Sequence, residues 1–359
     1  MFEYDESVLL TLRSLIWAIR VLIKGPCFMS LEKVDALVVR TVDFSESSLI
    51  VDAFTRELGK IHGIAKGAKR LKNPFETSLD ILSSIRLCFI RKNSNALDLF
   101  TEASLCRRFR PTSKNYRGLY AGYYVAELLE YSVADYQPYP DLWILADSTL
   151  ENLQYRTNVE ARVAYFECGL LDAFGEFPSL RFCVNCGERL PLERISNLAR
   201  RVFFAVDAGG VVCTKCRARK LFTSLIPTTV GALKVFEVAC NGSKEAVKIA
   251  KMLEGWRRDV EEKSDEISWI DKVEREKEVG RAFSALDDEC LAPFGAFPEI
   301  ARREYRDLVE LYICRTLRRR LRLFDYLPFA VGYRDTETKC EDQTGSIADE
   351  NGKKVVVSA

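Results

Sequence analysis

Two short motifs, CVNC at residues 183–186 and CTKC at residues 213–216, decide the organisation of this chain of 359 residues. Each CxxC turn directs two thiolates at one point, and two such turns brought together form a closed tetrahedral site that suits structural zinc. Redox-active or accidental cysteine pairs are the alternative, but a redox CxxC normally occurs singly, near a βαβ pattern. We therefore predict a structural Zn²⁺ ion, with no catalytic role, bound by Cys183, Cys186, Cys213 and Cys216.

The residues between the two motifs predict a zinc-ribbon-like module. Arg201–Ala205 and Gly209–Val212 have the composition of short strands, and a glycine-rich turn at residues 207–210 joins them. Helical patterns lie before and after this region. The module is therefore expected to occupy about residues 180–220, as an insertion between helices.

Short strands are predicted between Leu31 and Leu105. A turn at residues 57–60 makes a hairpin of the second and third strands. Five strands with a longer connection between the third and the fourth have the element order of an OB-fold barrel, although an SH3-like barrel or a small sandwich would share most of this pattern. We expect an OB-fold domain at residues 29–105, with strands at Val34–Val42, Ser48–Thr55, Lys60–Lys66, Ser84–Arg91 and Ala96–Thr101.

Beyond Pro111 the apolar residues recur with the period of a helix. The first helical segment, 116–133, is rich in tyrosine; a base-stacking platform is one interpretation, and packing in the core is the favoured one. The predicted fold class is α+β: an N-terminal OB-fold β-barrel, then a mainly α-helical domain at 106–330 that carries the zinc module. Further helices are predicted at 142–153, 163–173, 228–240 and 304–323.

Three segments lie outside this plan. Residues 1–28 hold an apolar run that charges interrupt; it is too charged for a membrane span and lacks the basic start of a signal peptide. An amphipathic helix is one interpretation, and a translation start at Met29, just before the first predicted strand, is the simpler one. The acidic stretch 254–290 predicts solvated helix faces or a poorly ordered insertion. Residues 331–359 lose the apolar period, which predicts a disordered tail.

The composition is that of a soluble globular protein, with 48% hydrophobic residues, 29% charged residues and a net charge of +1. Four of the twelve cysteines form the two motifs, and the others are scattered singly. Scattered cysteines in apolar runs predict buried free thiols in a reducing cytosol. We expect a cytoplasmic protein that does not enter a membrane.

The sequence lacks the residue patterns of several common classes of enzyme. His62 is its single histidine, so a Ser-His-Asp triad or a histidine metal cluster would have to include this residue. Its position in a strand-like run instead predicts an ordinary strand or surface histidine. The sequence contains no P-loop, no dinucleotide-binding glycine motif after a strand and no nucleophile elbow. We predict that the protein is not an enzyme.

A one-sided cluster of positive charge follows the second predicted strand. Residues 56–72 contain six basic side chains against one acid, Glu57, and glycines 63 and 67 allow close approach of a backbone. Such a cluster on a barrel can hold phosphates without reading bases, whereas a solvated charged face is the alternative. The candidate DNA-binding residues are Arg56, Lys60, Lys66, Lys69, Arg70 and Lys72.

A second basic cluster lies at the end of the last predicted helix. Arg315, Arg318, Arg319 and Arg322 have i, i+3, i+4, i+7 spacing and would share one helical face. These arginines could grip phosphates or pair with the acidic stretch 254–290. The sequence does not separate the two.

Six stretches of the sequence carry a resemblance to a known family: Val38–Ser48, Phe54–Lys60, Ala65–Arg70, Glu127–Leu129, Phe166–Gly175 and Cys183–Gly187. They resemble the bacterial RecO recombination mediator family. The similarity covers roughly residues 29–240, and more weakly 300–328. The extension at 1–28 is not expected in this family, the acidic stretch has the character of extra length, and the tail has no recognisable counterpart.

The resemblance implies DNA repair and homologous recombination in the RecF pathway. It implies binding to single- and double-stranded DNA, annealing of complementary strands, and work with RecR and single-stranded-DNA-binding protein to load RecA at the nucleoid. The six basic residues would contact DNA, and the four cysteines would bind zinc. Two other classes stay open: a zinc-ribbon and barrel module that binds RNA or protein in transcription or translation, and a nucleic-acid enzyme with a carboxylate–metal site.

Overall fold

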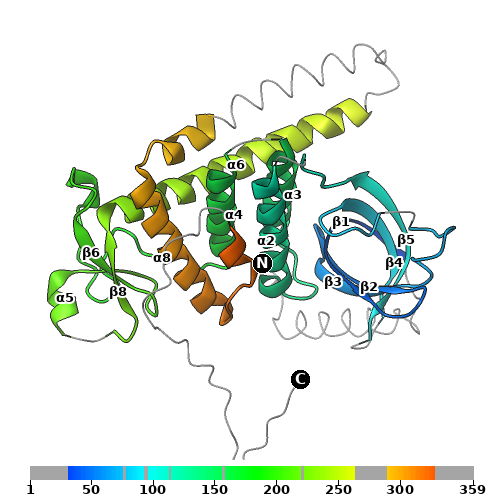
Figure 1. Cartoon of the computed structure of the whole chain (residues 1–359), viewed down its shortest axis with the longest axis horizontal. Coiled ribbons are helices and arrows are strands. Elements are labelled where there is room, and N and C mark those ends of the chain that lie inside the picture. Colours follow the sequence, from blue (N-terminus) through cyan, green and yellow to red (C-terminus); the bar gives the residue numbers. More distant parts are fainter. Residues whose placement is uncertain are drawn as a thin grey trace, which may run out of the picture.

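Three parts follow one another across the molecule, with a β-barrel at one end, a layer of helices in the middle and a small sheet at the other end (Figure 1). This arrangement is the α+β fold that the sequence predicts. The computed structural model describes residues 31–75, 78–92, 96–112, 115–155, 158–219, 222–262 and 289–327.

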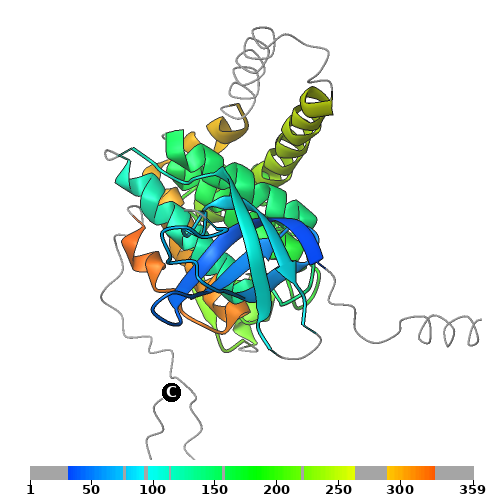
Figure 2. The same ribbon diagram turned by 90° about the vertical axis from the view of Figure 1, so that its right-hand side faces the viewer.

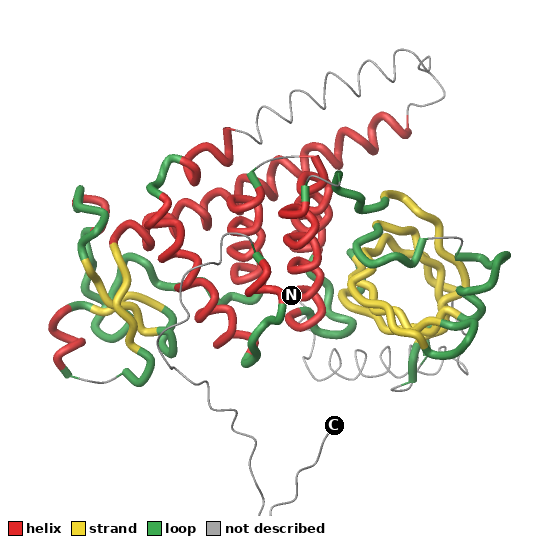
Figure 3. The backbone as a smooth tube through the Cα atoms, in the orientation of Figure 1, coloured by secondary structure: helices red, strands yellow, loops and turns green. Residues whose placement is uncertain are grey.

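The barrel closes in the strand order β1-β2-β3-β5-β4 and appears as a ring in Figure 3. Strands β3 and β5 pair in parallel, whereas the other neighbours pair antiparallel. This is the OB-type barrel predicted from the sequence. Its strands are β1 (Leu31–Asp43), β2 (Leu49–Thr55), β3 (Gly59–Ala65), β4 (Ser84–Ile90) and β5 (Asp98–Arg107).

The barrel closes because its strands alternate apolar and polar residues and because one strand bends. Residues of β3 alternate strictly between buried and half-buried positions. A bulge between Val38 and Arg40 lets β1 pair with both β2 and β4. A side chain at Gly63 would lie 2.0 Å from the Phe100 ring, so glycine is needed where that ring fills the barrel. Figure 2 shows the barrel from its outer side.

The helices pack into one apolar core that also includes residues of the barrel. Leu37, Val39 and Phe54 belong to this core, and the indole N–H of Trp143 donates to the Phe54 carbonyl at 3.2 Å. The barrel is therefore fixed against the helices by buried contacts. The helices are α2 (Tyr116–Ser132), α3 (Pro140–Tyr155), α4 (Val159–Ala173), α6 (Val230–Glu262) and α8 (Glu299–Leu317).

A buried ion pair lies at the centre of the helical layer. Arg306 of α8 donates to Glu167 of α4, and the Tyr124 hydroxyl of α2 donates to the same carboxylate at 2.7 Å. Burial raises the pKa of Glu167 above its usual value, although Arg306 and Tyr124 oppose that shift. Three helices are joined by this one group.

The small sheet lies between α4 and α6 in the sequence. Its order is β7-β6-β8, from β6 (Arg201–Ala205), β7 (Gly210–Val212) and β8 (Leu225–Thr229). Strands β6 and β7 lie where the sequence predicted them. Strand β8 was not predicted, because it contains Pro227 at the sheet edge and runs directly into α6.

Two predicted helices have other bounds in the structure. The segment predicted at 228–240 continues as α6 to Glu262, past the glycines at 242 and 255. The helix predicted to end at 323 ends at Leu317, because Arg318 adopts a left-handed conformation with φ 51°. The prediction that Arg315, Arg318, Arg319 and Arg322 share one helical face is therefore wrong.

Several predictions concern residues outside the described ranges. The N-terminal extension 1–28, the tail 331–359 and most of the acidic stretch 254–290 lie there. Among the described helices, none is both long and apolar enough to span a membrane.

Candidate metal centre and nucleic-acid interface

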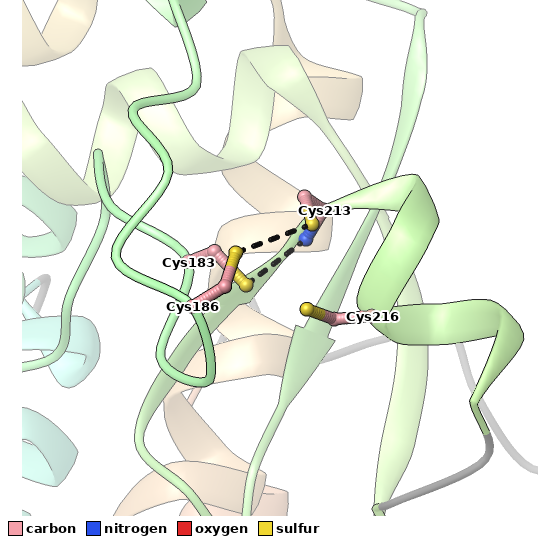
Figure 4. Close-up of side chains that lie close together, drawn as sticks. All are labelled: Cys183, Cys186, Cys213 and Cys216. Atoms are coloured by element: carbon pink, nitrogen blue, oxygen red, sulfur yellow. Dashed lines mark hydrogen bonds between the residues drawn. The ribbon is translucent and has the colours of Figure 1, made fainter.

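Four cysteines from two turns lie side by side at the edge of the small sheet (Figure 4). Cys183 and Cys186 belong to a turn that Gly187 closes with φ +72°, and the Gly187 N–H donates to the Cys183 carbonyl at 2.9 Å. Cys213 follows β7 and precedes the short helix α5 (Thr214–Ala218), which carries Cys216. Each pair is formed by its local turn, and the first turn is held against β7 by hydrogen bonds from the Val184 N–H to the Val211 carbonyl at 3.0 Å and from the Val211 N–H to the Ser179 carbonyl at 2.9 Å.

The distances between the thiols suit a metal with four sulfur ligands. All four Sγ atoms lie within 4.8 Å of one another, and the Sγ atoms of Cys186 and Cys213 are 3.7 Å apart. Tetrahedral zinc with Zn–S bonds of about 2.3 Å needs sulfurs about 3.8 Å apart. The four residues predicted as ligands thus form one cluster that could bind a metal such as zinc.

Hydrogen bonds favour negative charge on the sulfur of Cys183, whereas the pKa values of the neighbouring thiols Cys186 and Cys213 are raised. Burial raises the pKa of the Cys183 thiol, but the N–H groups of Cys213, Cys186 and Asn185 outweigh burial and hold this pKa at about 6. The side-chain amide of Asn185 also donates to Cys216 Sγ at 3.2 Å. N–H donors that point at sulfur are the outer support that a thiolate–metal site needs.

The candidate nucleic-acid interface begins where β3 ends. Residues 66–72, which we call the basic loop, leave the barrel through a turn in which Gly67 has φ +75°. The Lys69 N–H donates to the Ser47 carbonyl at 3.1 Å, and its ammonium contacts Asp43 at 2.7 Å. These contacts hold the basic loop against the turn between β1 and β2.

Four of the six predicted DNA-binding residues lie on this loop and face solvent. Lys66, Lys69, Arg70 and Lys72 are all exposed. Within the described part of the chain, only Lys69 among these four has an ion-pair partner. The loop therefore presents four exposed cations from seven consecutive residues, and three of them have no ion-pair partner among the described residues.

The other two predicted residues, Arg56 and Lys60, lie between the barrel and the helices. Arg56 pairs with Glu254 of α6 and lies 5.8 Å from the Trp143 ring centroid. The Lys60 ammonium donates to the Glu130 carbonyl at 2.7 Å, and its side chain is only 12% exposed. The structure thus separates these two cations from the basic loop and engages them in contacts between the two parts.

His62 belongs to the same contact between the barrel and the helices. It lies in β3, as predicted, with Nδ1 at 2.5 Å from Asp52 and Nε2 at 2.9 Å from Asp135, just beyond α2. The hydrogen bond to Asp52, supported by Asp135, raises the pKa of His62 despite partial burial. A carboxylate at each ring nitrogen favours the imidazolium form.

Sequence reasoning missed two apolar side chains beside the basic loop. Phe44 is exposed in the turn that contacts the loop, and Leu71 is fully exposed within the loop. Phe44 lies between Asp43 and Ser45, so its polar surroundings in the sequence were the one available signal. Exposed apolar groups beside cations suit a ligand that has both phosphates and bases.

Two family profiles match this chain over most of the described residues. The profile described as recombination protein O, N terminal, matches residues 29–109, and the profile described as recombination protein O, C terminal, matches residues 113–237. The first covers the barrel, and the second covers α2 to the start of α6 together with the cysteine cluster. These matches define the class as recombination protein O.

Curated relatives agree with this class. The DNA repair protein RecO of Rhodopirellula baltica is 42% identical over 182 residues, which are 51% of this chain and 66% of that protein. The DNA repair protein RecO of Dehalococcoides mccartyi is 30% identical over 203 residues, which are 56% of this chain and 76% of that protein. The chain belongs to the RecO family.

Proposed function

We propose that this protein is a DNA repair and recombination mediator that holds DNA strands by their phosphates and anneals complementary strands without breaking or forming covalent bonds. The basic loop carries this proposal, because its four cations are exposed and, among the described residues, only Lys69 has an ion-pair partner. Lysine and arginine at such a site bind any sequence and release it as salt rises. A protein that pairs strands needs both properties.

We further propose that the four cysteines bind a structural zinc ion, which closes the small sheet and supplies no chemistry. Four protein ligands leave no open position for a substrate. The family membership supports cytoplasmic partners at the nucleoid: RecR, single-stranded-DNA-binding protein and, indirectly, RecA. The similar proteins of Rhodopirellula baltica and Dehalococcoides mccartyi are DNA repair proteins, which supports DNA repair as the setting.

Strand annealing is the test of this function. The purified protein is mixed, without ATP, with complementary labelled strands that are bare or coated with single-stranded-DNA-binding protein. We expect faster annealing in both cases. Good DNA binding without faster annealing would reduce the protein to a binding module, and a preference for RNA would place it in transcription or translation.

A triple variant tests the basic loop itself. Lys66→Ala, Lys69→Ala and Arg70→Ala together should flatten the log–log salt dependence of single-strand binding by about 2, at roughly 0.7 for each phosphate that the variant no longer neutralises. The matched control removes three exposed lysines of α6, Lys244, Lys248 and Lys251. An equal effect in both triple variants would mean that net charge, and not the loop, binds DNA.

A further inference from the structure

One face of helix α2 presents tyrosines to solvent. Tyr116, Tyr120 and Tyr123 have i, i+4, i+7 spacing and are 54%, 39% and 39% exposed. The favoured sequence interpretation, packing in the core, holds for Tyr124, which is fully buried, and is wrong for these three. A soluble protein seldom leaves three large rings on one helical face without a use.

The segment after α8 runs along α2 in the opposite direction and extends this face. The first contact is Arg319 over the Tyr131 ring, at 4.0 Å from its centroid. The last is Tyr326, at the end of η2 (Leu323–Tyr326), whose ring stacks on Tyr120 with centroids 6.2 Å apart and planes 17° apart. Figure 1 shows this segment beside α2. The site therefore already holds one parallel stack of aromatic rings.

Buried contacts fix the segment against α2. The Glu127 carboxylate accepts the N–H groups of Arg322 and Leu323 at 2.7 and 2.9 Å. Phe324 packs edge-on against Tyr124 with ring centroids 5.7 Å apart. Glu127 is buried and used by these bonds, so it offers no negative charge to the surface.

Four arginines lie on α2 or on the segment that packs against it. Arg117, Arg318, Arg319 and Arg322 are exposed. Within the described ranges none of these four side chains has a carboxylate partner, and the Arg319 guanidinium lies over the Tyr131 ring. Rings with unpaired arginines beside them match a ligand that carries flat bases and phosphates in alternation.

We propose that this tyrosine–arginine face, formed by Tyr116, Tyr120, Tyr123, Tyr326, Arg318, Arg319 and Arg322, binds a single strand of nucleic acid. The bases stack on the tyrosine rings, and the phosphates contact the arginines. The inference rests on the proposed function, because annealing needs a second place for a strand besides the basic loop. It differs from the loop in its chemistry, since the loop offers charge and this face adds stacking.

The test compares two probes of equal length, an oligothymidylate and an abasic strand with the same phosphates and no bases. Tyr120→Ala with Tyr123→Ala should weaken oligothymidylate binding at least about fivefold for each ring that stacks on a base. Binding of the abasic strand and of a duplex should stay unchanged, because neither offers an unpaired base. Alanine at exposed helical positions preserves α2.

Three further variants complete the design. Tyr120→Phe with Tyr123→Phe keeps the rings and should bind like the unchanged protein. Ile300→Ala removes an exposed apolar side chain at the start of α8 and should have no effect. Arg318→Ala with Arg322→Ala should weaken both single strands alike and flatten the salt dependence by about 1.4.

The outcomes separate this inference from the proposed function. If the tyrosine-to-alanine variant binds both single strands like the unchanged protein, or binds both more weakly by the same factor, the tyrosine–arginine face is not a base-stacking site. This result leaves the basic loop untouched. If the unchanged protein binds no DNA at all, both proposals fail. If the unchanged protein binds DNA, the tyrosine variant loses binding as expected and the basic-loop variant keeps full binding, only the proposed role of the basic loop fails.

Discussion

The two ends of the molecule are stable for different reasons. The barrel has its own apolar core, in which Phe75, Phe89 and Phe100 are fully buried behind a closed ring of strands. The opposite end, which contains the small sheet and the four cysteines and which we call the cysteine end, buries a separate cluster of five described residues. Three of those five are Cys183, Cys213 and Cys216. A cluster of that size offsets less of the entropy of ordering its chain than the barrel core does, so the proposed metal ion would stabilise this end and not the barrel.

Replacement of two of the proposed metal ligands should give the largest difference in stability between the cysteine end and the barrel. In Cys183→Ser with Cys186→Ser, the local free energy of unfolding of the cysteine end should fall by as much as about 10 kcal/mol, the scale of structural zinc binding. Hydrogen exchange measured by mass spectrometry should show reduced protection at residues 179–219 and no change in the barrel. Cys106→Ser, an exposed thiol of the barrel, is the matched control. Unchanged protection with unchanged metal content would contradict the structural-zinc proposal.

The helical layer lies between the two ends of the molecule. A variant at Arg306, in its core, tests how far the stability of the whole molecule depends on this layer. This side chain is 3% exposed and pairs with Glu167. Arg306→Met leaves a buried carboxylate uncompensated, so the free energy of unfolding should fall by about 3–5 kcal/mol. Urea titration measures this decrease. Adding Glu167→Leu should recover most of it, and a double variant as unstable as the single one would mean that packing, not charge, explains the effect.

The contact between the barrel and the helices offers a smaller test. Arg56→Ala removes the ion pair with Glu254 and the contact with the Trp143 ring. Half-buried interactions of these kinds contribute about 1 kcal/mol together. Urea titration should show that decrease in stability, while the salt dependence of DNA binding should change less than in the basic-loop variant. If Arg56→Ala weakens DNA binding by more free energy than it lowers the free energy of unfolding, Arg56 belongs with the DNA-binding residues.

The smallest expected effect is a pH dependence of the same contact. The pKa of His62 is raised in the folded protein by Asp52 and Asp135. Its contribution is therefore fully present below the unfolded pKa of about 6.5 and disappears as pH rises through the folded value. The melting temperature should fall over that window by more in the unchanged protein than in His62→Gln. Parallel curves for both proteins would show that His62 does not stabilise the contact.

Much of this fold follows from local patterns. Strand alternation and turn spacing predicted the five barrel strands in the right order, and the two CxxC motifs predicted the cluster of four cysteines. Both kinds of pattern depend only on residues that are close together in the chain, so they can be recognised in the sequence. The end of α8 at Arg318 was not predictable, because a left-handed residue there is usually glycine.

The roles of the charged and aromatic surface residues depended on packing. Arg56 and Lys60 look in the sequence like Lys66 and Arg70, yet a carboxylate 198 positions away at Glu254 holds Arg56 against the helices. The tyrosines of α2 show the same limit, since a helix that is apolar all round does not reveal which face a neighbour covers.

The sequence by itself determined that this protein has a barrel, helices and a four-cysteine module, because strand alternation, helical period and ligand spacing are properties of neighbouring residues. Only the tertiary structure decided which cations and rings face solvent. That choice depends on what the rest of the chain brings against them, and a carboxylate or a core from a distant segment has no signature near the residues it covers.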